Sequence, residues 1–164
     1  MKSKAKLAGH PIHPMLIVFP LGLLVSSVVF DIVSKLSGNN VFATVAFWSI
    51  AGGIIGGLVA ALFGFWDWLT IPAGTRAKII GAWHGGSNVI VVVLFAISWI
   101  LRWNDPEHLS GVVPFILEIV AIVLGAIAGW MGGELVFRLG VGVDSDANLD
   151  APNSLSSSMD EDAR

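Results

Sequence analysis

Histidines, carboxylic acids and one amide are the residues of this chain whose types and spacing could do chemistry. His10 and His13 stand in a His-Pro-Ile-His-Pro segment near the N-terminus, and His84 precedes Asn88 by about one helical turn. Neutral imidazole is a common ligand of metals and of haem iron, so histidines from separate segments predict a haem or metal site. The chain has no cysteine, which excludes thiolate ligands and cysteine nucleophiles.

Two carboxylates extend this set. Asp67 lies in a Trp-Asp-Trp segment at the predicted C-terminal end of a helix, where the helix dipole disfavours an anion. It therefore needs a positive partner such as Arg76, Lys78, a histidinium or a bound cation, or it orients a ligating histidine through the second ring nitrogen. Glu134 precedes Arg138 by four residues, which favours an ion pair between them.

These residues are compatible with three kinds of site. In the first, His84 and either His10 or His13 bind a b-type haem, supported by Asp67 and Asn88. In the second, a divalent metal ion is ligated by His13, His84, Asp67 and Glu134. In the third there is no cofactor, and the polar side chains only stabilise the helices.

Four long apolar segments must position these residues. The 164-residue chain is 55% hydrophobic and 13% charged, whereas about 25% of residues are charged in ordinary soluble domains. A helix of about 20 apolar residues crosses a bilayer, and residues 15–34, 41–69, 79–103 and 112–139 qualify. Their connections are short, which makes neighbouring helices antiparallel. The predicted fold is all-α: an integral membrane, antiparallel four-helix bundle over residues 1–143.

The basic residues predict the orientation of this bundle. Seven of the nine lie on the side of both termini, which is the cytoplasmic side by the positive-inside rule. They are Lys2, Lys4, Lys6, Arg76, Lys78, Arg138 and Arg164. The candidate site residues fall at the same side. No basic patch suits nucleic acid.

Two further segments carry expectations. Residues 144–164 are acidic and serine-rich and are expected to form a disordered cytoplasmic tail. Glycines of the second and fourth spans form small-xxx-small faces, which predict packing of those two helices or a homodimer. These are Gly52, Gly53, Gly56 and Gly57, and Gly125, Gly129 and Gly133.

The outer half offers few ionisable groups. Asp31 needs a positive partner, and Glu118 is expected either to be protonated or to face the third span. His108 stands beside Asp105 and Glu107 and is expected to be solvated. No continuous proton relay and no internal repeat are evident.

Several segments together resemble a bacterial membrane-protein family, domain of unknown function 2231. The resemblance covers residues 7–143. It rests on GHPIHPMLIVFPLGLL (9–24), Asp31, the GFWD segment (64–67), His84 with Asn88, and GGELV (132–136) leading to GVGV (140–143). Relatives often have histidine before GVGV, where this chain has Leu139.

The resemblance implies a multi-pass protein of the bacterial inner membrane. Relatives fused to Rieske-type iron–sulfur domains imply electron transfer with a redox partner, and the architecture is similar to small b-type cytochromes. The expected function is a small redox or haem- or metal-binding membrane subunit without catalytic turnover of its own. The alternative is a non-enzymatic scaffold or partner subunit.

Overall fold

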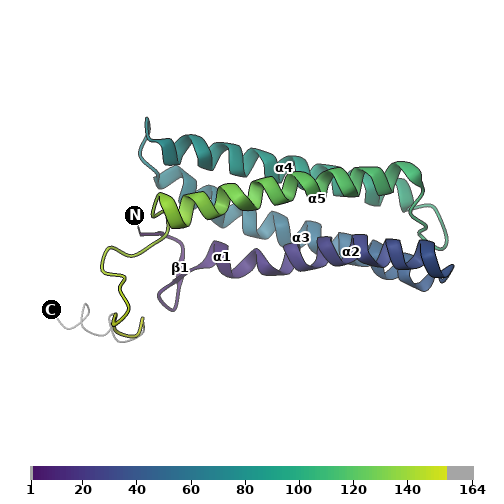
Figure 1. Ribbon diagram of the computed structural model, residues 1–164, viewed down its shortest axis with the longest axis horizontal. Helices are drawn as coiled ribbons and strands as arrows, with labels where there is room; N and C mark the ends of the chain where they lie inside the picture. Colours follow the sequence, from purple (N-terminus) through teal and green to yellow (C-terminus); the bar gives the residue numbers. More distant parts are fainter. Residues whose placement is uncertain (1, 155–164) are drawn as a thin grey trace.

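Four long helices dominate the computed structural model, which describes residues 2–154 (Figure 1). A short hairpin, β1 (Lys6–Leu7) and β2 (His10–Pro11), precedes α1 (Ile12–Leu16), α2 (Val18–Ser37), α3 (Val41–Thr70), α4 (Arg76–Arg102), α5 (Val112–Gly133) and the π-helix η1 (Glu134–Arg138). The segments Ile12–Ser37, Val41–Thr70, Arg76–Arg102 and Val112–Arg138 are each long and apolar enough to cross a membrane. The predicted helical fold with four such segments is confirmed.

The helices form two hairpins, α2 with α3 and α4 with α5, which lie against each other (Figure 1). The connections within the hairpins meet at one end, where the Asn40 amide donates to Glu107 at 2.7 Å. We call this the arginine end, after Arg102. The N-terminal hairpin, the α3–α4 connection and the segment after η1 lie at the opposite end, which we call the histidine end, after His13 and His84.

Local signals account for the helix boundaries. α2 stops at Gly38, whose φ of 69° is the left-handed conformation that ends many helices. The Thr75 hydroxyl caps α4 by accepting the Lys78 amide at 3.2 Å. Pro14 lies in the first turn of α1, where its missing amide hydrogen costs nothing.

A residue before proline favours extended backbone, which predicts extended conformations for both His10 and His13, but this is wrong for His13. His10 is in β2, whereas His13 lies inside the short helix α1. The steric preference of a residue that precedes proline is modest, and a hydrogen bond from His13 to α3, described below, holds this helical turn in place.

The two hairpins bury equivalent positions. On α2 and α4 the equivalent buried residues are 71 positions apart: Pro20 and Val91, Leu24 and Phe95, Ser27 and Ser98, Asp31 and Arg102. On α3 and α5 a second constant spacing relates Ala46 and Pro114, Ile50 and Glu118, Gly53 and Ala121, Ala60 and Ala128. The structure therefore contains an internal repeat that the sequence does not make evident.

The glycine-rich face of α3 packs on α2 rather than on α5, contrary to the expectation. A Cβ added to Gly53 would lie 2.5 Å from Leu24 Cδ2, and one added to Gly56 would lie 3.3 Å from Pro20 Cδ. Small residues let neighbouring helices of one hairpin approach closely. These glycines are thus used within the chain.

Candidate functional site

His13 is fixed between α1 and α3. Its Nδ1 donates a hydrogen bond to the carbonyl of Ala60 at 2.9 Å. Gly64, one turn further along α3, leaves room for the ring, since a Cβ there would lie 2.8 Å from His13 Cε1. The imidazole is half-buried and packs against the backbone of α3 at Gly64.

His84 repeats this arrangement in the second hairpin. Its Nδ1 donates to the carbonyl of Ala128 on α5 at 2.8 Å. Gly132 is the residue one turn further on, and a Cβ there would lie 3.1 Å from His84 Cε1. The trio of histidine, alanine carbonyl and glycine therefore occurs once in each half of the repeat.

The repeat brings the two imidazoles together. Their ring centroids are 6.4 Å apart and the ring planes are perpendicular. Since both Nδ1 atoms carry the proton, each ring keeps the lone pair of Nε2 for another partner. This is the tautomer in which a metal-ligating histidine is held by a backbone carbonyl.

The two glycines after His84 are exposed on the surface of α4. Cβ atoms added at Gly85 or Gly86 would meet nothing within 4 Å. Asn88 contacts His84, as its position on the same helix face predicts: its Nδ2 donates to the His84 carbonyl at 2.9 Å and lies 3.4 Å from Nε2. A ligand on Nε2 would replace that longer contact.

The other predicted site residues have partners elsewhere. Asp67 accepts the Ser3 hydroxyl at 2.7 Å and the Lys4 amide at 3.3 Å, rather than pairing with a basic side chain. The exposed His10 lies 3.3 Å from the Ser154 hydroxyl. Within residues 2–154, no group of three or more histidine, cysteine, aspartate or glutamate side chains is placed to hold a metal ion.

Glu134 pairs with Arg76 rather than with Arg138. The distance from Arg76 Nη2 to Glu134 Oε1 is 2.7 Å. Glu134 opens the π-helix η1, whose wider turn changes the i, i+4 relation on which the predicted pair depended. Leu139 is the C-terminal cap of this π-helix.

A family model matches residues 9–145, and its description is predicted membrane protein (DUF2231). The chain belongs to this family. No curated protein and no solved structure matches the chain. The DUF2231 match spans both histidine trios and all four long helices, so the candidate site lies wholly within the family domain.

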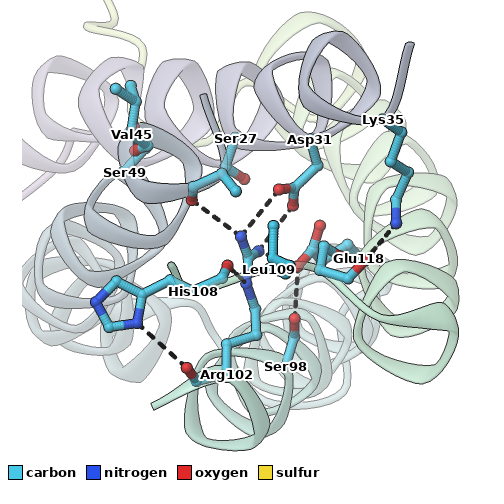
Figure 2. A network of polar contacts seen from close by, with 12 residues as sticks. Ser27, Asp31, Lys35, Val45, Ser49, Ser98, Arg102, His108, Leu109 and Glu118 are labelled. Carbon is cyan, nitrogen blue, oxygen red and sulfur yellow. Dashed lines mark hydrogen bonds and ion pairs between the residues drawn. The ribbon is translucent and has the colours of Figure 1, made fainter. Parts of the chain in front are cut away.

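The DUF2231 domain contains a second polar cluster at the arginine end, centred on Arg102 (Figure 2). The guanidinium binds Asp31 through two parallel hydrogen bonds of 2.7 and 2.9 Å and reaches Glu118 Oε1 at 3.0 Å. Its remaining N–H groups donate to the carbonyls of Ala43 and His108. All five N–H groups are thus used, and the three ionisable side chains are fully buried.

Sequence reasoning foresaw parts of this cluster. Glu118 faces the third span, as one of the two expectations for it predicted. It accepts hydrogen bonds from the Ser98 hydroxyl and from Arg102, both on α4. The positive partner that Asp31 requires is Arg102, one of the two basic residues that lie away from the termini. The expectation that His108 is solvated is wrong, since its ring stacks on Phe47 with centroids 3.9 Å apart.

Proposed function

We propose that this DUF2231 protein is a small redox subunit of the bacterial inner membrane that binds a b-type haem through His13 and His84. The two imidazoles are the observation that carries the proposal. Because a metal lies about 2 Å from a ligating imidazole nitrogen, two imidazoles on opposite sides of one metal have centroids roughly 6 Å apart. The centroids of His13 and His84 are 6.4 Å apart.

The donor set favours haem over a bare divalent ion. A porphyrin would supply most of the ligands of a bound haem iron, so His13 and His84 together could hold it. A protein site for zinc supplies at least three ligands, whereas Asp67 and Glu134 bind Ser3 and Arg76.

The protein's own residues would do three things at this site. The carbonyls of Ala60 and Ala128 fix the imidazole tautomer and raise its basicity. Gly64 and Gly132 let the rings lie against the helices. The apolar helices exclude water. A bound haem would supply one-electron chemistry.

The histidine end is proposed to face the cytoplasm. Seven of the nine lysines and arginines occur in the segments that form this end or in the sequence after it. By the positive-inside rule this distribution favours both termini inside. Electrons would then be exchanged with a partner near the inner leaflet.

Absorption spectra of the purified full-length protein test the proposal. Protein produced with added haem precursor should show a Soret band, a reduced-minus-oxidised α band and a pyridine haemochrome at one haem per chain. Both His13→Ala and His84→Ala should lose most of the haem, because each removes one of two axial ligands.

His10→Ala is the matched control, since His10 lies three residues from His13 but is exposed, and its ring bonds to the Ser154 hydroxyl rather than to α3. It should retain haem. Protein without haem after supplementation, or haem that persists in both His13→Ala and His84→Ala, would refute the proposal.

The alternative is a membrane scaffold. Its supporting observation is that both imidazoles already bond to backbone carbonyls across a helix pair, which would stabilise the hairpins without any ligand. In that case the variants would lower stability and the wild-type protein would bind no haem.

A further inference from the structure

Glu118 is a buried acid that the haem proposal does not use. It lies on α5 near the arginine end, and its side chain is completely inaccessible to solvent. One carboxyl oxygen, Oε1, accepts from Ser98 Oγ at 2.5 Å and from Arg102 Nη1 at 3.0 Å. The other, Oε2, is buried and has no hydrogen-bond partner.

The charges around Glu118 do not balance if it is ionised. Arg102 supplies one positive charge. Its Nη1 and Nη2 both donate to the carboxylate of Asp31 on α2, which makes a bidentate pair. Bidentate hydrogen bonds between a guanidinium and a carboxylate are stronger than single ones, so we take Asp31 as the ionised partner of Arg102. A second buried carboxylate would leave one uncompensated negative charge, which is strongly unfavourable in a low-dielectric interior.

Other charged groups near the cluster have different partners. Lys35 on α2 donates to the carbonyl of Ser110 and lies over the Phe115 ring, 5.1 Å from its centroid. The His108 ring stacks on Phe47 and its Nδ1 faces the carbonyl of Arg102. Among the described residues, no basic side chain other than Arg102 forms an ion pair with Glu118.

We propose that Glu118 is a proton-binding site, which holds a proton on Oε2 in the folded protein at neutral pH. The ligand is a single proton, and the bound form makes the cluster of Asp31, Arg102 and Glu118 electrically neutral. The position in the first hairpin that is equivalent to Glu118 is the apolar residue Ile50. The buried acid is therefore specific to the second hairpin and is not part of the packing that both hairpins share. This inference does not depend on haem binding.

Infrared spectroscopy of the full-length protein in lipid nanodiscs tests the site directly. At neutral pH the wild type should show the C=O stretch of a protonated carboxylic acid, which moves to lower frequency in heavy water. Glu118→Gln should abolish this band entirely. Glu107→Gln, which changes an exposed acid in the neighbouring loop, should leave the band intact.

A measurement on the wild type alone keeps the test independent of variant folding. Labelling of glutamate with a ¹³C carboxyl should move the band, whereas labelling of aspartate should not. Absence of an acid band at neutral pH would overturn the proposal. A band that moves with labelled aspartate, or that first appears when Lys35→Met removes the nearby cation, would overturn it equally.

Discussion

At the scale of single residues, Arg102 is the side chain on which the buried charges of this protein depend. It donates hydrogen bonds to both Asp31 and Glu118, and each of its N–H groups has an acceptor. Removal of one partner from a buried ion pair strongly destabilises the fold, because the remaining charge stays desolvated. This loss exceeds the net stabilisation that the intact pair provides.

Arg102→Met should therefore lower the free energy of unfolding by about 3–5 kcal/mol. Reversible unfolding in mixed micelles, followed by tryptophan fluorescence, measures the change. Arg76→Met is the control, because Arg76 is largely exposed in its pair with Glu134 and exposed pairs contribute about 0–1 kcal/mol. Equal effects of the two substitutions would contradict the role assigned to the Arg102 cluster.

At the scale of elements, close contact within the first hairpin depends on Gly53. The nearest atoms to an added Cβ are Leu24 Cδ2 at 2.5 Å and Leu24 Cγ at 2.6 Å, so α2 and α3 must separate or Leu24 must leave its rotamer. Overpacking of this kind costs about 1–3 kcal/mol, which is the destabilisation expected for Gly53→Ala.

Gly129→Ala provides the comparison for that experiment. Gly129 is also helical, but a Cβ there meets nothing within 4 Å. The substitution should be neutral or stabilising by up to about 1 kcal/mol, because alanine has the higher helix propensity. Similar destabilisation by both changes would show that helix contact is not the cause.

At the scale of the whole molecule, the segment before the first span is in contact with the segment that follows the last span. Lys6 Nζ donates to Asp144 Oδ1 at 2.7 Å, and Lys2 pairs with Asp146 at 3.6 Å. The hydrogen bond from Lys6 holds the pKa of Asp144 below its ordinary value. The pair between Lys6 and Asp144 is partly exposed, so screening by solvent keeps its contribution to global stability small.

A lowered pKa fixes the direction of the pH dependence. The contribution of this pair is present above the unfolded pKa of aspartate, about 3.9, and is lost as pH falls through the lower folded value. NMR titration of the Asp144 carboxyl carbon should give a midpoint below the ordinary range, which returns upward in Lys6→Gln. Lys4→Gln should leave the midpoint unchanged, and a midpoint insensitive to Lys6 would contradict the contact.

The sequence predicts the four long helices and part of the candidate site. Apolar length predicts the four spans, and the helical spacing of His84 and Asn88 predicts their contact. Residue types alone cannot choose between His10 and His13, since that choice depends on the Ala60 carbonyl of a helix 47 residues away. The pairing of Asp31 with Arg102 likewise depends on how two hairpins meet.

The internal repeat is not evident in the sequence for a related reason. Equivalent positions share burial more often than identity, as Leu24 with Phe95 and Ile50 with Glu118 illustrate. Close packing constrains combined volume and shape rather than residue names. Identity is confined to a few pairs, which include His13 with His84 and Gly64 with Gly132.

The internal repeat also limits what a symmetric assembly of single hairpins could achieve. Two identical hairpins, joined about a twofold axis, would supply a pair of equivalent histidines. At the positions of Asp31 and Arg102, however, the same residue would face itself, so two like charges would be buried together. An ion pair at those positions requires halves that differ, and one chain that carries both halves builds it without a second copy.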